Sequence, residues 1–174
     1  MTFSKTLCVG PVRNGRGIIA LKSFAPGATI CRIKGRIVSA KTVWRYWDID
    51  RRRAENCFRF DPDCYLDPEG EIGAFANHSC NPNARIVRTA RGLYLRALKA
   101  IAAGREITHD YSTLLGADDV WTMKCDCGER NCRRVVANVA KLPAGVVRRY
   151  QRLDAIPLFI LEPLGMRASA KSAC

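Results

Sequence analysis

The chain has only two histidines, and each lies in a short polar segment: residues 77–83 (NHSCNPN) and residues 108–111 (THDY). The first segment directly follows the apolar run Ile72–Ala76, which places its polar groups near the core. Buried polar groups need hydrogen-bond partners, and a bound polar ligand can supply them. With the cysteines of residues 125–132, the two segments predict a pocket that contains a tyrosine and lies beside a metal site. The alternative is a turn-rich loop whose side chains bond their own backbone.

Short apolar segments broken by glycine and proline predict a mainly β domain with a helical C-terminal tail. With 174 residues, of which 48% are hydrophobic and 26% charged, the chain is long enough to bury its own core as one soluble globular domain. The expected strands lie at residues 7–9, 15–20, 28–33 and 35–38, with a strand pair around turns at residues 59–62 and 64–68 and a hairpin at residues 86–98. Helices are expected at residues 142–153 and 156–165, and residues 41–56 are either a short helix or an irregular insert.

The formal net charge is +13, from 29 basic and 16 acidic residues. Such an excess favours polyanions or acidic surfaces as partners, although high arginine usage in an ordinary soluble protein explains it equally well. No helix-turn-helix pattern or aromatic-interleaved basic segment indicates direct reading of bases. No run of eighteen apolar residues predicts a membrane span, and residues 1–5 lack an apolar signal core. We expect a cytoplasmic protein without a membrane partner, and leave open association with chromatin or a nucleoid, or secretion into another cell.

The cysteines are nine in number, which is odd, and no signal peptide accompanies them, so metal ligation and free thiols are favoured over disulfides. Cys125, Cys127 and Cys132 follow the spacing C-x-C-x4-C, which is one ligand short of a tetrahedral zinc site. The fourth ligand must come from elsewhere in the chain. The alternative is three free thiols in a tight basic loop. The remaining cysteines are interpreted as small hydrophobic residues or spare thiols (Cys8, Cys31, Cys57, Cys64) and as a chain end (Cys174).

The tripeptide Gly15-Arg16-Gly17 lies between two expected strands. On its own it indicates a tight turn. It also permits close approach of the backbone to a ligand, because glycine has no Cβ to collide with it. It is not a dinucleotide-binding fingerprint, since it has neither a third glycine nor a following helix.

Taken in order, these motifs resemble those of SET-domain protein lysine methyltransferases that carry a C-terminal cysteine (post-SET) zinc motif. The family motif NHSCxPN corresponds to residues 77–83 without substitution, and its G-E-E-L-T-x-D-Y corresponds to residues 104–111. Weaker matches are the opening G-x-G of residues 15–27 and the I-D-A strand at residues 66–68. The resemblance covers roughly residues 7–134.

The resemblance implies a fold of several small curved sheets, in which a threaded connection makes a pseudoknot. Threading of this kind is an exception among protein folds. It also implies a division into a SET domain (residues 1–118), a post-SET zinc-binding segment (residues 119–134) and a helical C-terminal extension (residues 135–174).

The activity implied by the resemblance is transfer of a methyl group from S-adenosylmethionine to a lysine side chain of a protein. The implied fourth zinc ligand is Cys80. The implied donor-binding residues are Gly15, Arg16, Gly17, Asn77, His78 and Tyr111. Tyr111 would also orient the lysine amine, and Tyr65 would line the lysine channel unless it is only a core residue. Because the ordinary pKa of tyrosine is about 10, we assign Tyr111 a positioning role and not that of a general base.

Two positions depart from the family pattern. His109 stands where the family has phenylalanine or tyrosine, at a position that helps to set how many methyl groups are added. The product could therefore be mono-, di- or trimethyllysine. Arg105 replaces the first acidic residue of G-E-E, which changes surface charge but not the implied donor site.

The sequence thus predicts a zinc-containing lysine methyltransferase, with a histone or another nucleic-acid-associated protein as substrate. One alternative is an inactive SET-like module that binds nucleic acid or a protein tail, which would not need to bind the methyl donor. A second alternative is a zinc-ribbon nucleic-acid protein, whose binding would depend steeply on salt.

Overall fold

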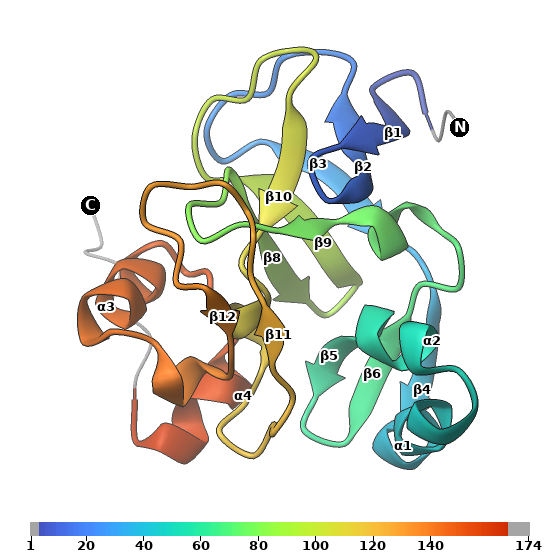
Figure 1. Cartoon of the computed structure of the whole chain (residues 1–174), viewed down its shortest axis with the longest axis vertical. Coiled ribbons are helices and arrows are strands. Elements are labelled where there is room, and N and C mark those ends of the chain that lie inside the picture. Colours follow the sequence, from blue (N-terminus) through green and yellow to red (C-terminus); the bar gives the residue numbers. More distant parts are fainter. Residues whose placement is uncertain (1–3, 167–174) are drawn as a thin grey trace.

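The computed structural model describes residues 4–166, so Cys174 and the end of the C-terminal extension lie outside the described part. Short strands dominate the first two thirds of the chain and helices the last quarter (Figure 1). In chain order the elements are β1 (Leu7–Val12), β2 (Gly15–Ala20), β3 (Thr29–Ile33), β4 (Arg36–Ser39), α1 (Ala40–Ile49), α2 (Arg51–Asn56), β5 (Phe58–Asp61), β6 (Cys64–Asp67), β7 (Asn77–His78), β8 (Ala84–Thr89), β9 (Gly92–Ala97), β10 (Glu106–His109), β11 (Met123–Lys124), β12 (Val135–Val136), α3 (Ala144–Arg152) and α4 (Leu158–Leu161). The expected class, mainly β in several small sheets with a helical tail, is confirmed.

The sheet that builds the site has the strand order β1-β2-β10-β7. Strand β10 lies between two partners: it is antiparallel to β2, where Ile107 faces Ile18, and parallel to β7. Both isoleucines are fully buried, which fixes the face that β10 turns inward. The parallel pairing sets Thr108 opposite Asn77 and His109 opposite His78. It therefore brings together the two polar segments that the sequence analysis singled out, whereas the threaded connection stays a prediction.

A second sheet, β3-β9-β8, supplies much of the main core. Its β8–β9 hairpin is the expected one, with Thr89 paired to Gly92 at the turn. Along β9 the buried residues alternate, so Leu93, Leu95 and Ala97 point into the core. This period of two is the pattern of a sheet with one buried face.

The third sheet, β4-β6-β5, is flanked by α1 and α2, and these helices settle the open question about residues 41–56. Each helix begins at a side-chain cap: the Ser39 hydroxyl accepts the Thr42 N–H at 3.2 Å, and the Asp50 carboxylate accepts the Arg53 N–H at 3.1 Å. Such caps satisfy backbone donors that a helix start leaves free. On the buried side of α1, the Tyr46 hydroxyl donates to Asp67 of β6 at 3.2 Å.

The C-terminal extension has a small core of its own, which includes Val139, Val147 and Ile160. The first expected helix is confirmed as α3. The second is shorter than expected, because α4 ends at Leu161 and a 3-10 turn follows at Glu162–Leu164. Pro163 lies in that turn, and its missing N–H cannot continue the α-helical bonding.

The extension packs against β8 through two contacts between distant parts of the sequence. The Arg85 guanidinium lies 3.7 Å from the Asp154 carboxylate, and the Arg88 guanidinium lies 6.0 Å from the centre of the Phe159 ring. Figure 1 shows α3 on the opposite side of the molecule from α1 and α2. Between residues 4 and 166, no helix has both the length and the apolar character needed to cross a membrane. The predicted boundaries at residues 118/119 and 134/135 stay predictions.

Candidate functional site

Four thiols from two separate parts of the chain meet beside the central sheet. The Sγ atoms of Cys80, Cys125, Cys127 and Cys132 all lie within 4.8 Å of one another. The Cys80–Cys125 separation is 3.8 Å and the Cys125–Cys132 separation is 3.6 Å. Tetrahedral zinc with Zn–S bonds of about 2.3 Å requires sulfur atoms about 3.8 Å apart. The four residues predicted as metal ligands are therefore brought together in a geometry that fits a zinc ion.

The surroundings of the thiols also suit a metal cluster. Backbone N–H groups point at two of the sulfurs: Arg133 donates to Cys80 at 3.3 Å and Arg134 to Cys132 at 3.5 Å. Such bonds stabilise a metal-bound thiolate. Burial raises the pKa of the Cys80 thiol to about 11, while the Arg134 N–H lowers the pKa of Cys132 to about 7. A bound cation would make the thiolate the stable form at Cys80 as well.

The other cysteines of the described residues form no disulfide: Cys8, Cys31, Cys57 and Cys64. Each is partly buried. Burial raises the pKa of Cys31 to about 11 and that of Cys57 to about 12, which keeps both protonated and unreactive at neutral pH. These observations agree with their interpretation as small hydrophobic residues or spare thiols.

His78 connects the thiol cluster to Tyr111. Its Nδ1 atom accepts the Tyr111 backbone N–H at 3.2 Å, and its Nε2 atom lies 3.3 Å from the sulfur of Cys80. Because the Tyr111 N–H can only donate, the proton of the neutral ring is on Nε2 and points at that sulfur. Burial lowers the pKa of His78 to about 4, so the ring is neutral at physiological pH. Both ring nitrogens are thus occupied, which leaves the backbone of His78 as its means of contacting a methyl donor.

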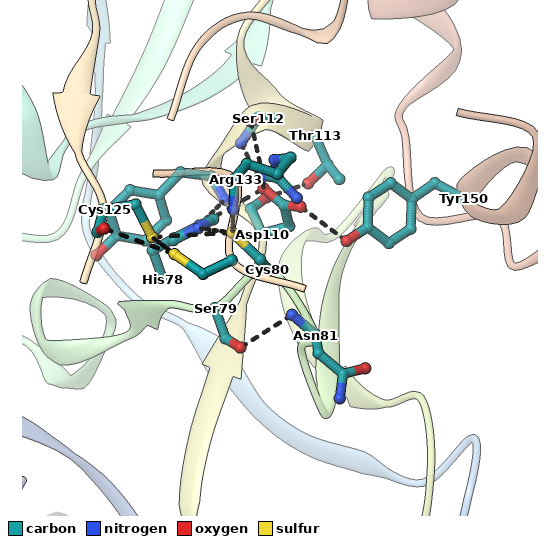
Figure 2. A network of polar contacts seen from close by, with 12 residues as sticks. His78, Ser79, Cys80, Asn81, Asp110, Ser112, Thr113, Cys125, Arg133 and Tyr150 are labelled. Atoms are coloured by element: carbon teal, nitrogen blue, oxygen red, sulfur yellow. Dashed lines mark hydrogen bonds and ion pairs between the residues drawn. The ribbon is translucent and has the colours of Figure 1, made fainter. Parts of the chain in front are cut away.

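The carboxylate of Asp110 is the centre of the polar network in Figure 2. Its side chain is fully buried. Oδ1 accepts bonds from the Arg133 guanidinium at 2.8 Å and from the Ser112 N–H at 3.1 Å, and Oδ2 accepts one from the Tyr150 hydroxyl at 2.7 Å. Burial alone would raise the pKa of Asp110, but the hydrogen bond and charge of Arg133 outweigh it and keep that pKa below its ordinary value. The carboxylate is therefore ionised and held in one orientation.

Tyr111 follows Asp110 and is held at both ends. Its backbone N–H donates to His78, and its phenol hydroxyl donates to the Ala76 carbonyl at 2.9 Å. Its ring packs against the rings of His78 and His109, at centroid distances of 5.3 Å and 4.9 Å. Burial raises the pKa of Tyr111 above its ordinary value, so the phenol stays protonated and cannot act as a general base near neutral pH. This agrees with the positioning role expected from the sequence.

His109 is buried between Tyr111 and Phe58 and lines the large cavity described below. Neither of its ring nitrogens has a hydrogen-bond partner. Burial lowers its pKa to about 3, so the ring is neutral. Both ring nitrogens are also buried, so in this structure neither is open to the cavity.

The glycine turn and Asn77 form a cradle at the β2–β10–β7 edge. The Asn77 side-chain amide donates to the Arg16 carbonyl at 3.0 Å and to the Glu106 carboxylate at 2.8 Å. Gly15 adopts a φ of 86°, which favours glycine. A Cβ atom on Gly17 would lie 2.5 Å from a Glu106 oxygen and 2.9 Å from the Asn77 amide nitrogen. An added Cβ would force these side chains to shift, so glycine favours the close approach that brings together Gly15, Arg16, Gly17 and Asn77.

A cavity of about 950 Å³ opens beside Tyr111. Its walls include parts of α1, α2, β5, β6, the segment 114–121 and α4. The lining is rich in aromatic side chains: Trp44, Trp47, Phe58, Tyr65, Tyr111, Trp121 and Phe159. The charged lining consists of one arginine, Arg59, and four carboxylates, Glu55, Asp63, Asp118 and Asp119. Tyr65 thus faces the same cavity as Tyr111, as expected for a channel residue.

Sequence reasoning missed Tyr150 and the role of Arg133. Arg133 directly follows Cys132, and the sequence indicated only that it adds to the basic charge beside the thiols and helps to keep them ionised. Tyr150 lies three residues after the buried Val147 on α3, which is the spacing of an ordinary core residue. Nothing in the sequence indicates that its hydroxyl reaches a carboxylate forty residues earlier.

Replacing His109 with phenylalanine is expected to make the fold less sensitive to acid. The pKa of His109 is about 3 in the folded protein and about 6.5 when unfolded, so below pH 6.5 the unfolded state takes up a proton that the folded state excludes. The wild type should therefore lose stability as pH falls from 6.5 towards 3, by up to about 1.4 kcal/mol per pH unit more than the variant. Urea unfolding at several pH values and one fixed zinc concentration measures this, and parallel pH profiles would contradict it.

Comparison with known proteins matches residues 15–112 to the SET domain family model. Two histone-lysine N-methyltransferases specific for H3 lysine-36 are similar: one from Candida albicans, 28% identical over 98% of this chain, and one from Cryptococcus neoformans, 29% identical over 91%. Each alignment covers 20% of the relative, so the chain spans about a fifth of their length. Histone-lysine N-methyltransferase ASHH3 from Arabidopsis thaliana is 30% identical over 69% of this chain and 35% of its own. Since the family match covers more than half of the chain and includes both polar segments, this chain belongs to the SET-domain family.

Proposed function

We propose that this protein is a zinc-containing protein lysine methyltransferase, which transfers a methyl group from S-adenosylmethionine to a lysine in a basic protein segment. The observation that carries the proposal is the position of Tyr111, whose protonated phenol lies at the cavity and is bonded to Ala76, the residue before Asn77 of the cradle. The relatives named as histone-lysine N-methyltransferases make histones the first substrates to test.

The charge of the cavity supports a basic substrate despite the net charge of +13. Four carboxylates and a single arginine line it. Two of the carboxylates, Asp118 and Asp119, bind Arg59 at 2.8 Å and 2.9 Å, so part of their charge is neutralised within the wall. Asp63 is exposed at the lining. The net negative lining attracts a lysine-containing segment locally.

The remaining surface carries the basic excess and suits the polyanion to which such a substrate is bound. A histone tail on chromatin combines a basic segment with an attached nucleic acid, and a nuclear or chromatin-associated location follows from that choice of substrate. Acidic cavity and basic exterior together would orient the protein on such an assembly.

In the proposed reaction the protein mainly positions the reactants and excludes water. S-adenosylmethionine would supply a methyl group already activated on a sulfonium. An uncharged amine would attack that methyl carbon in line, so that the N–C bond forms as the C–S bond breaks and the neutral thioether leaves. Loss of water around an entering lysine would lower its pKa and favour its reactive form, whereas the carboxylates of the lining act in the opposite direction. Tyr111 cannot take a proton, so its hydroxyl orients the amine and the methyl group.

The cradle fits the amino-acid end of the donor. The Glu106 carboxylate and the Arg16 carbonyl present acceptors for an ammonium group, and the Arg16 side chain offers a partner for a carboxylate. Gly17 allows the backbone to approach closely. Asn77 and the backbone of His78 complete the proposed donor site.

Replacing Tyr111 with phenylalanine should lower methyl transfer by about 10²-fold or more, because the hydroxyl that orients the amine is lost. The measurement is mass spectrometry of histone H3 incubated with the donor. Tyr94→Phe is the matched control, since Tyr94 lies on β9 outside the cavity lining, and it should keep full activity. Equal activity of the two variants would contradict the role of Tyr111. A wild type that neither binds the donor nor labels any protein would favour the inactive module instead.

Replacing Gly17 with alanine should abolish detectable donor binding, because the added Cβ collides with Glu106 and the Asn77 amide. Isothermal titration calorimetry with S-adenosylmethionine measures it. Gly145→Ala is the control: Gly145 is exposed on α3, and the nearest atom to an added Cβ is 4.0 Å away. Unchanged affinity in Gly17→Ala would place the donor elsewhere.

The thiol cluster should hold one zinc ion per chain. Cys125→Ser is expected to lower the zinc content and the melting temperature, since a structural zinc site contributes directly to folding. Elemental analysis of the purified protein measures the metal. Cys57→Ser, at a thiol outside the cluster, should keep the full zinc content. If both variants kept their zinc, or if both lost it equally, the result would contradict this zinc site.

A further inference from the structure

Tyr150 of α3 reaches the candidate site from a part of the chain beyond the segment that matches the SET family model. Its side chain is almost completely buried, at 1% exposure. Its hydroxyl donates to Oδ2 of Asp110 at 2.7 Å (Figure 2). This is a charge-assisted hydrogen bond between segments forty residues apart.

Asp110 transmits this contact to both sides of Tyr111. It precedes Tyr111 in the chain, and its Oδ1 atom accepts the N–H of Ser112, the residue that follows Tyr111. Arg133 also binds Oδ1. The donors at Oδ1 (Arg133 and the Ser112 N–H) and at Oδ2 (Tyr150) together set the orientation of the carboxylate. The backbone on either side of Tyr111 depends on that orientation.

The hydrophobic part of Tyr150 could by itself serve only the small core of the extension, where it packs with Val147 and Ile156. Phenylalanine would fill that role equally well. The hydroxyl has a role outside that core, because it donates the hydrogen bond to Oδ2 of the fully buried Asp110 carboxylate. Loss of a partner from a buried charged group is costly, and the group shifts to find another.

The extension also touches the cavity itself. Phe159 and Ile160 of α4 and Pro163 of the following turn contribute to its lining. The same packed unit thus contacts the site at two points: the wall of the cavity and the carboxylate next to Tyr111. A shift of Tyr150 relative to Asp110 would change the position of Tyr111.

We propose that Tyr150 is a positioning residue for methyl transfer, which acts through Asp110 to hold the Tyr111 phenol in place. The inference rests on the proposed function. Donor binding should change little, because the cradle on β2, β7 and β10 holds the amino-acid end of the donor and Tyr111 would contact only its methyl group. Since a misplacement of about 1 Å can cost about 10²-fold in rate, loss of the Tyr150 hydroxyl should act on kcat and leave the donor Kd unchanged.

The experiment compares Tyr150→Phe with Tyr46→Phe in the full chain. Tyr46 makes the same kind of buried bond, from its hydroxyl to Oδ2 of Asp67 at 3.2 Å, but it is not part of the cavity lining. Melting temperature, donor Kd and kcat for a histone H3 substrate are measured below both melting temperatures. Both variants should melt earlier. Only Tyr150→Phe should lose kcat, by about tenfold or more, with its donor Kd within about twofold of wild type.

A double-mutant cycle shows whether the effect passes through Asp110. In an Asp110→Asn background, where the charged acceptor is gone, adding Tyr150→Phe should change kcat by less than about twofold. Fully additive effects would mean that Tyr150 does not act through Asp110, and would overturn the proposal. So would a Tyr150→Phe protein that loses no more kcat than Tyr46→Phe.

Failure of the proposed function has a different signature. A wild type that binds no S-adenosylmethionine and labels no protein would overturn the proposed function, and the role of Tyr150 with it. An active wild type with an equally active Tyr150→Phe variant would overturn the role of Tyr150 alone. If Tyr150→Phe melts below the assay temperature, the cycle is run at a lower temperature where circular dichroism shows all four proteins folded, and the same two criteria decide.

Discussion

The ionised carboxylate of Asp110, buried without solvent contact, is the interaction on which the rest of the site depends. It can remain charged in the interior only because three segments donate hydrogen bonds to it. The donors are the Ser112 N–H just after β10, Arg133 of the cysteine-rich segment and Tyr150 of α3. Each donor ties a different part of the chain to the backbone around Tyr111. A buried charge is costly when it loses a partner, so these three segments are held together by the same requirement.

The thiol cluster applies a similar constraint on the other side of His78. Cys80 belongs to the polar loop after β7, and its three companions belong to the segment 125–132. His78 stands between the cluster and Tyr111, with one ring nitrogen directed to each. Thiols, imidazole, tyrosine backbone and carboxylate therefore form one continuous network, in which the position of the phenol is determined by polar contacts and not by local chain geometry.

Much of this site could be predicted from residue patterns. The thiols at residues 125, 127 and 132, the polar loop with Cys80, and Tyr111 all stand in short motifs whose spacing reflects their chemistry. The strands could be read because Leu93, Leu95 and Ala97 alternate with polar residues. The sequence could not decide whether residues 41–56 form helices, because their charges and tryptophans give no clear apolar face. The cap residues Ser39 and Asp50 were not enough to decide it. Tyr150 could not be found, because its partner is set by the tertiary packing of α3, and its own neighbourhood in sequence is that of a core residue.

The carboxylates around the cavity have a further consequence for turnover. Methylation of a lysine leaves its positive charge in place. For the proposed reaction, an acidic lining that draws in a lysine also attracts the methylated product, and electrostatics alone cannot release it. A preference between an unmodified and a modified side chain must then come from the shape of the aromatic walls. The number of methyl groups added before release would therefore depend on how well the cavity accommodates the methylated ammonium group.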